Sequence, residues 1–445
     1  MSDVSFVRTD MLSEQEPPAS SVGVVGWMRE NLFSSWVNTI LTLLSAGLLY
    51  LVLSSLLPWA ISPTWNAVSL GECREILHEL GRDGHFSGAC WGVVRDRWVQ
   101  LFMGFYPSEL YWRPILAFIL LIVALAPILF ADKVPAKLIW FSGLYVFLMP
   151  WLLWGGSIWA PVSALVGFVL GFVAYQMGTT RISNLVGLIL GVVTALIWWL
   201  FLSGYIVDFL AAVPTEQNPS AGVLPLAIDS VNSRLFGGFM LSITIGVIAI
   251  ACSLPLGVVL ALGRQSDLMI VKVLCVGFIE FIRGVPLITL LFVASTLLNI
   301  FMPPGTAFDI ILRVLIMVTI FAAAYMAEVI RGGLAALPKG QYEGADSLGL
   351  NYWQAQRLII MPQALKISIP GIVSTFIGVF KDTTLVSIIG LLDPLGLSNA
   401  IRADAAWNGV VWELYGFIAL LFWVFCFSMS RYSMYLERKL QTGHR

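Results

Sequence analysis

Residues 343–362 read EGADSLGLNYWQAQRLIIMP and lie between two long hydrophobic runs, 309–330 and 367–391. With its flanks this stretch forms a polar segment, 331–366, of about 36 residues, which is far longer than a turn between two neighbouring helices. Glycine adopts backbone conformations that other residues avoid, so we expect Gly349 to allow a sharp turn after a short helix. A short exposed helix of this kind can insert into a groove on a soluble partner.

The composition places most of the chain in a lipid bilayer. Of 445 residues, 58% are hydrophobic and 11% are charged, and the mean hydropathy is +0.87. Soluble domains have about 45–50% apolar and about 25% charged residues. Ten stretches are long and apolar enough, or nearly so, to cross about 30 Å of hydrocarbon as helices: 36–57, 114–131, 137–154, 160–178, 183–203, 238–262, 271–300, 309–330, 367–391 and 410–431. We therefore predict an all-α, multi-pass membrane protein with about ten transmembrane helices.

Basic residues indicate the orientation of these helices. Ten is an even number, so both termini lie on the same side. With the N-terminus inside, fifteen lysines and arginines fall on the inner side and seven on the outer side, five of them in the long loop 58–113. Because basic residues are retained in the cytoplasm, both termini are predicted to be cytoplasmic, within tails 1–35 and 436–445. The net charge of −1 gives no basic field for nucleic acid.

The chain divides near a polar stretch rich in proline, 204–237, which we predict to be a periplasmic linker. Before it, residues 36–203 form an extension of about five helices. Four glycines at four-residue spacing indicate that some of these helices pack closely: Gly167, Gly171, Gly187 and Gly191. After the linker, residues 238–435 form a second part with about five helices and the polar segment 331–366.

Cysteines and histidines give one weak prediction. Cys73 and Cys90 share the polar loop 58–113 and would form a disulfide if that loop faces an oxidising compartment. Two unpaired cysteines are an equally good interpretation of their spacing. The three histidines lie in this loop and at the C-terminal tail, so no spacing predicts a metal site.

Polar residues at membrane depth are costly and are candidates for function. Those in the second part are Glu280, Arg283, Lys381, Asp382, Thr383 and Thr384. Glu280 and Arg283 have the i,i+3 spacing of an ion pair, and either a structural pair or a substrate contact fits that spacing. Pro286 is expected to bend or break their helix and so to expose backbone groups to a solute.

The second group of candidates, Lys381 to Thr384, offers a base, an acid and two hydroxyls at one level. These groups complement the carboxylate and ammonium of a zwitterion. The alternative is a neutralising pair of Lys381 and Asp382 that fixes helix packing. Glu328 and Arg331 have the spacing of an ion pair at the cytoplasmic boundary, and there a structural role is favoured.

The polar segment resembles a family motif. Glu343-Gly344-Ala345, Gly349, Ile359 and Met361-Pro362 have the spacing of the EAA loop of ABC importer permeases: Glu-Ala-Ala, three residues, Gly, nine residues, Ile, one residue, Leu-Pro. Gly344 and Met361 depart from the pattern conservatively. The resemblance implies that this loop contacts an ATPase through Tyr342, Glu343, Gly344, Ala345, Leu348, Gly349, Ile359 and Pro362. We expect Tyr342, Ala345 and Leu348 to lie on one side of the short helix.

Three further segments resemble the polar amino-acid permeases of this family. They begin at Glu280, Ala327 and Lys381, and the four segments together lie within residues 236–435. The long N-terminal part and the residues around Lys381 are most similar to the M-type permease subunits of general L-amino-acid transporters. The resemblance implies a five-helix core of the type I ABC importer fold in a bacterial inner membrane, which carries L-amino acids from periplasm to cytoplasm by alternating access.

The same resemblance implies a set of partners: a second permease in a heterodimer, two ATPase subunits and a periplasmic amino-acid-binding protein. The chain has no Gly-x-x-x-x-Gly-Lys-Ser/Thr sequence, so ATP and Mg²⁺ are expected on the separate ATPase and no enzymatic activity in this chain. Two other hypotheses are a secondary transporter driven by an ion gradient and a membrane scaffold or sensor. Discontinuous helices in two related halves would mark the former, and the two halves of this chain do not resemble each other.

Overall fold

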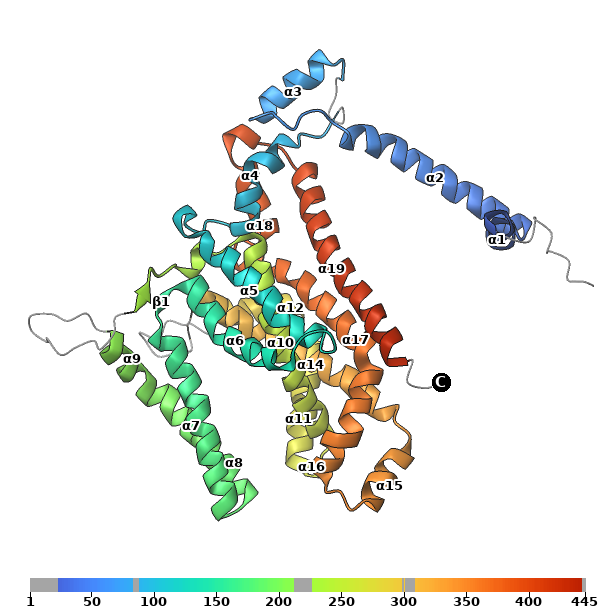
Figure 1. Ribbon diagram of the computed structural model, residues 1–445. Coiled ribbons are helices and arrows are strands. Elements are labelled where there is room, and N and C mark those ends of the chain that lie inside the picture. The colour runs from blue at the N-terminus through green and yellow to red at the C-terminus, as the bar shows by residue number, and fades with distance from the viewer. Residues whose placement is uncertain (1–22, 83–87, 212–225, 298–299, 301–308, 442–445) are drawn as a thin grey trace, which may run out of the picture. The chain divides into compact units, whose positions relative to one another are not determined.

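The computed structural model describes residues 23–82, 88–211, 226–297, 300 and 309–441. The predicted positions 1–22, His85, the linker residues 212–225 and the tail residues 442–445 lie outside this range. The described chain is almost entirely helical (Figure 1) and divides into two compact units, Met1–Arg95 and Asp96–Arg445.

The first unit contains α1 (Gly23–Asn31), α2 (Trp36–Ala60) and α3 (Leu70–Glu79). α2 is a 25-residue apolar helix that buries none of its residues within the described chain, as expected of a helix that faces lipid. Ser35 and Ser69 cap α2 and α3, because each hydroxyl accepts a hydrogen bond from a backbone N–H of the first turn.

The loop after α2 is a small ordered structure. Cys73 and Cys90 are joined by a disulfide, and both are buried with Ala67 and Leu77. The indole of Trp91 donates a hydrogen bond to the carbonyl of Ala60 over 2.7 Å and thereby ties the end of this loop to the end of α2.

The second unit begins within α4 (Gly92–Met103). Its helices up to the linker are α5 (Trp112–Leu129), α6 (Ile139–Trp154), α7 (Trp159–Arg181), α8 (Asn184–Ile197) and α9 (Ser203–Ala211), with a π-helical turn at Trp198–Leu202 and short 3₁₀ turns at Ser108–Leu110 and Ala136–Leu138. α7 and α8 pack at their glycines, since a β-carbon at Gly171 would lie 3.0 Å from the carbonyl oxygen of Gly191. The predicted close packing is confirmed.

The remaining helices of this unit are α10 (Gly238–Arg264), α11 (Met269–Gly284), α12 (Leu287–Phe292), α14 (Ile310–Ala335), α15 (Lys339–Ser347), α16 (Tyr352–Ala355), α17 (Met361–Asp382), α18 (Pro394–Arg402) and α19 (Trp412–Gln441). Shorter turns are the 3₁₀ turns Ser233–Leu235, Thr383–Ile389 and Ala405–Trp407 and the π-helical turns Val293–Leu297 and Gln356–Ile360. α15 and α16 lie at one end of the unit and α18 lies at the other (Figure 1).

Nine helices of the described residues are long and apolar enough to cross a membrane, and one bent pair also passes this test. In that pair, α11 and the helix from Leu287 to Leu297 meet at an angle of 100°, so the predicted run 271–300 is broken at Pro286, as its proline predicted. α11 contacts Glu328 of α14 through Arg283, whereas the carbonyl of Ser295 accepts a hydrogen bond from Arg313 of α14. These α14 residues lie about 22 Å apart along the helix. The described chain therefore has nine candidate spans, or ten if this bent pair counts as one broken span.

The only sheet among the described residues attaches the chain after the linker to the extension. β1 (Gly156–Ser157) pairs antiparallel with β2 (Ala227–Ile228), with Gly156 opposite Ile228. Beside it the buried guanidinium of Arg113 donates a hydrogen bond to the carbonyl of Asp229 over 2.6 Å.

One hydrophobic core joins the extension to the helices after the linker. α5 and α6 contribute Ala117, Ala124, Tyr145, Met149, Leu152 and Leu153, and α10 and α14 contribute Met240, Leu241, Ile245, Ala249, Ile311, Val314, Val318 and Ala322. A second core at the Arg264 end of α10 includes Ile279, Met326, Ile330, Leu334, Ile360 and Ala364. α5 and α6 therefore share one hydrophobic core with α10 and α14.

Candidate coupling segment and charged cluster

The polar segment has the local structure expected of it. α15 runs from Lys339 to Ser347, and the chain turns at Gly349, whose φ of +69° is a conformation that favours glycine. Asn351 then starts a new helix with a capping box, in which its side chain and that of Gln354 each accept a hydrogen bond from the other's backbone N–H.

α15 exposes a different face from the one expected. Ala345 is buried at 1% exposure, whereas Leu348 is 73% exposed. The three residues Tyr342, Ala345 and Leu348 therefore do not form one exposed surface: Ala345 is buried and Tyr342 is partly buried, whereas Leu348 is exposed at the C-terminal cap of α15, where its N–H still bonds to the carbonyl of Gly344. Glu343 and Gly344 are exposed beside Leu348, while Tyr342 packs on the core at the Arg264 end of α10, and this burial raises the pKa of its phenol.

The rest of the segment contains two predicted residues and two that were not predicted. The predicted Ile359 packs on the same core as Tyr342, and the predicted Pro362 lies in the first turn of α17. The two additional residues are Trp353, which is 70% exposed, and Leu358, which is 64% exposed. Large apolar side chains in a polar segment were the sequence signal for a contact surface.

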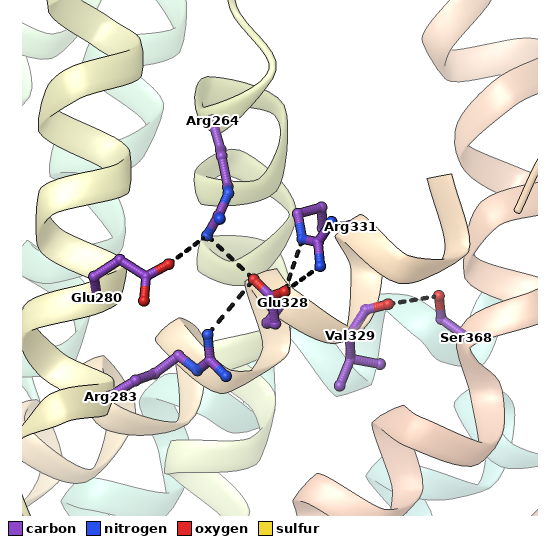
Figure 2. Close-up of polar contacts among 7 residues, drawn as sticks. All are labelled: Arg264, Glu280, Arg283, Glu328, Val329, Arg331 and Ser368. Atoms are coloured by element: carbon purple, nitrogen blue, oxygen red, sulfur yellow. Dashed lines mark hydrogen bonds and ion pairs between the residues drawn. The ribbon is translucent and has the colours of Figure 1, made fainter. Parts of the chain in front are cut away.

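A cluster of five charged residues lies at the Arg264 end of α10, where α10, α11 and α14 meet (Figure 2). Glu328 is its centre: Oε2 lies 3.2 Å from Nη1 of Arg264 and 3.6 Å from Nη1 of Arg283, and Oε1 accepts from Arg331. Arg264 also bonds the carboxylate of Glu280 over 3.0 Å. The predicted pair of Glu328 and Arg331 is present.

Glu280 and Arg283 take their partners from other helices, Arg264 and Glu328, and not from each other. The guanidinium of Arg283 also lies 5.5 Å from the ring centre of Tyr325. Arg264 was absent from our candidates. In the sequence, Arg264 is a basic residue at the end of a hydrophobic run. Sequence alone does not distinguish such a residue from an ordinary basic residue at a membrane boundary.

α17 connects this cluster to the polar segment. The hydroxyl of Ser368 donates a hydrogen bond to the carbonyl of Val329, the residue next to Glu328, over 3.3 Å (Figure 2). Helices α14 and α17 approach closely there, since a β-carbon at Gly333 would lie 2.5 Å from the carbonyl oxygen of Ala364. At the start of α17, Gln363 donates a hydrogen bond to Gln341 of α15 over 2.9 Å.

Comparison with known proteins identifies the family. Residues 253–442 match the family model described as binding-protein-dependent transport system inner membrane component. Over the full length of both chains, the sequence is 58% identical to the glutamate/glutamine/aspartate/asparagine transport system permease protein BztC of Rhodobacter capsulatus. The chain belongs to the family of amino-acid ABC transporter permeases.

Two other similarities accompany this result. The permease is 38% identical to the inner membrane amino-acid ABC transporter permease protein YhdY of Escherichia coli, over 97% of this chain and 98% of that one. One chain in the crystal structure of an amino acid ABC transporter with histidines has 29% sequence identity to the permease. The match covers 45% of the permease and 91% of that chain, with a TM-score of 0.41.

Family membership makes the permease a multi-pass inner membrane protein and a subunit of an amino-acid ABC transporter. Subunits of this family are permeases and not themselves enzymes, and such a transporter includes an ATPase and a binding protein as partners. The all-α membrane fold and the resemblance to polar amino-acid permeases are both confirmed.

The permease does not bring its two groups of candidate pathway residues together. Lys381 and Asp382 follow Phe380, whose ring lies 6.3 Å from that of Phe239 near the Gly238 end of α10 and packs against Gly246. Gly246 and Arg264 lie about 27 Å apart along α10. The group at Lys381 and the group at Glu280 are therefore at opposite ends of this helix.

The two hydroxyls in the Lys381 group are already used within their own helix. Thr383 is buried and its hydroxyl donates a hydrogen bond to the carbonyl of Phe380, while that of Thr384 donates to the carbonyl of Lys381. Lys381 is exposed and Asp382 is partly buried. The charged side chains are thus better placed than the hydroxyls to contact a solute.

Proposed function

We propose that the permease carries amino acids of the acidic and amide class, glutamate, glutamine, aspartate and asparagine, from periplasm to cytoplasm. The full-length similarity to the Rhodobacter capsulatus permease, whose name states these four substrates, carries this proposal. Transport proceeds by alternating access, in which the spans open toward one side of the membrane at a time. Both termini lie in the cytoplasm.

The energy comes from a separate ATPase, which binds ATP and Mg²⁺. Its contact surface is the exposed part of the segment 343–362, with Glu343 in α15, Leu348 at the C-terminal cap of α15, Trp353 in α16 and Leu358 in the π-helical turn after it. Exposed aromatic and aliphatic anchors beside a charged residue favour such a surface. Buried Ala345 and Tyr342 and the positive φ of Gly349 hold this surface in position.

The assembly contains this chain with a second, homologous permease, two copies of the ATPase and a periplasmic amino-acid-binding protein. The solute passes the charged side chains of Lys381 and Asp382 near one end of α10 and those of Glu280 and Arg283 near the other.

Reconstitution tests this function. Proteoliposomes that contain the permease, a candidate second permease, the ATPase and the binding protein should accumulate labelled glutamate, glutamine, aspartate and asparagine when ATP is present at the ATPase. Vesicles without ATP serve as the control. Uptake by this chain alone under an ion gradient, unaffected by ATP, would replace the proposal with a secondary transporter, and absence of any uptake would favour a scaffold or sensor.

A further inference from the structure

α11 is held in the unit differently from the helices on either side of it. α10 and α14 each bury twelve residues, whereas α11 buries only Ile279 and Ile282. Its other attachments include the packing of Cys275 against Gly263, the guanidinium of Arg283 beside the ring of Tyr325, and the ion pairs of Glu280 with Arg264 and of Arg283 with Glu328. Ion pairs therefore contribute to holding α11 in place.

These attachments are weak enough to be released. The side chain of Glu280 is 54% exposed and that of Arg283 is 31% exposed, and ion pairs with such exposure contribute about 0 to 1 kcal/mol each. α11 also ends at Gly284, just before the 100° break at Pro286. A helix that ends at a break can swing about it without disturbing the helix beyond.

Release leaves no charge of the cluster without a partner. If α11 moves away, Glu328 keeps Arg331 on its own helix and gains sole use of Arg264. Glu280 and Arg283 leave together, and their i,i+3 spacing on α11 lets them pair with each other. Each charge of the cluster therefore has a partner both when α11 is held and when it is released. An element that switches between two states at the membrane boundary requires this, because an unpaired charge there is costly.

The cluster is also mechanically connected to the ATPase-binding segment. Val329, next to Glu328, accepts the hydrogen bond of Ser368 on α17, and α17 is bonded to α15 through Gln363 and Gln341. The close packing at Gly333 leaves little room for α14 and α17 to slide. A movement of α15 can therefore be passed through α17 and Val329 to Glu328.

We propose that the charged cluster is an exchangeable clamp: Arg264 and Glu328 hold α11 through Glu280 and Arg283 in one state of the transport cycle, and in the other state Glu280 and Arg283 pair with each other while α11 swings about Pro286. Glu328 is a positioning residue in this device. The proposal rests on the proposed transport function for its place in the cycle, but the clamp itself is a property of this chain.

A native thiol reports the clamp without any need for transport. Cys275 on α11 packs against Gly263 of α10, where its sulfur would lie 2.4 Å from a β-carbon added to that glycine. In a chain with Cys252→Ser and Cys426→Ser, the rate of maleimide labelling of Cys275 measures how often α11 leaves α10. Glu328→Gln and the double variant Glu280→Gln/Arg283→Gln each remove more ion pairs from the held state than from the released state, and each should raise this rate about fivefold, the change that corresponds to about 1 kcal/mol.

The control is Lys272→Gln, which removes an exposed charge from the same helix outside the cluster and should leave the rate unchanged. The double variant Glu280→Gln/Arg283→Gln leaves Glu328 with Arg264 and Arg331 and so remains informative if Glu328→Gln fails to fold. Equal labelling rates in the parent, in the double variant and in Lys272→Gln would overturn the clamp, whatever the result of the uptake assay.

A reversible lock tests the role of release in the cycle. In the full complex, with Cys252, Cys275 and Cys426 replaced by serine, Arg283→Cys and Glu328→Cys are joined by a short bis-methanethiosulfonate cross-linker. ATP-driven uptake should fall at least about tenfold and return when dithiothreitol removes the cross-linker. Full uptake by the cross-linked complex would overturn the proposal, whereas absence of uptake from the parent complex would overturn the transport function and leave the labelling result standing.

Discussion

The two ends of α10 are built from different interactions. At the Gly238 end, apolar contacts and backbone hydrogen bonds dominate: the rings of Trp154 and Phe236 stack 4.5 Å apart, and the phenol of Tyr106 donates to the carbonyl of Leu153 over 2.8 Å. At the Arg264 end, charged side chains on three helices share one carboxylate, that of Glu328.

The difference indicates different mechanical roles. Buried aromatic packing is strong and has no alternative partner, so the Gly238 end forms a frame that joins the extension to the transport helices. Partly exposed ion pairs are weak and can exchange partners, so the Arg264 end is suited to movement. Four experiments test this contrast, in order of decreasing effect.

Truncation of a buried side chain should reduce stability more in the frame at the Gly238 end than at the Arg264 end. Phe236 is 1% exposed and packs between Trp154 and Tyr106. Phe236→Ala should lower the free energy of unfolding by about 3–5 kcal/mol, because it leaves a cavity. Thermal unfolding of the detergent-solubilised chain measures this loss, and Phe281→Ala, at a position 63% exposed, is the control that should change little. Equal effects of the two substitutions would refute a packed frame.

Disrupting the close approach of α14 and α17 should cause the next largest loss of stability. Gly333→Ala places a β-carbon 2.5 Å from the carbonyl oxygen of Ala364 and should cost about 1–3 kcal/mol of unfolding free energy. Gly332→Ala, where a β-carbon meets nothing within 4 Å, is the matched control. If uptake per hydrolysed ATP is the same in both variants, the contact at Gly333 does not transmit movement.

A smaller effect is expected at the exposed surface of the polar segment. Leu348→Ala and Trp353→Ala should each weaken ATPase binding about tenfold, or about 1.4 kcal/mol, without loss of folded chain. Binding of the purified ATPase to the solubilised permease gives the Kd. Trp140→Ala, at a position 82% exposed on α6, should not change it. An unchanged Kd in both segment variants would place the ATPase elsewhere.

The smallest effect concerns pH. Asp393 caps α18 beside the Gly238 end of α10, and burial raises the pKa of its carboxyl to about 6 although backbone N–H groups bond to it. An acid whose folded pKa is raised binds its proton more tightly in the folded state, so stability falls as pH rises from about 4 to about 6.

Between pH 7 and pH 5 the folded chain should therefore gain about 1 kcal/mol from Asp393. Asp393→Asn keeps a capping oxygen and removes the titration, so thermal unfolding of this variant should lack that gain. A pH dependence identical in the variant and the parent would show that another group is responsible.

Several local features of the chain follow from its sequence. The break at Pro286, the turn at Gly349 and the pair of Glu328 and Arg331 follow from backbone geometry or i,i+3 spacing, and the structure contains all three. The surface predicted from Tyr342, Ala345 and Leu348 was wrong, because exposure depends on what packs against α15 and not on spacing along it. Arg264 was not predicted, because its partners lie 16 and 64 residues away.

The sequence by itself determined the ten hydrophobic spans, the family motif and the residue types at membrane depth, because hydropathy and motif spacing depend only on order along the chain. Only the tertiary structure decided that α5 and α6 share a core with α10 and α14, and that Glu280 and Arg283 bond to other helices. Contacts between distant segments depend on how helices pack, and many packings satisfy the same hydrophobic pattern. The fold places the Lys381 group and the Glu280 group at opposite ends of one helix, although hydropathy assigned both to membrane depth.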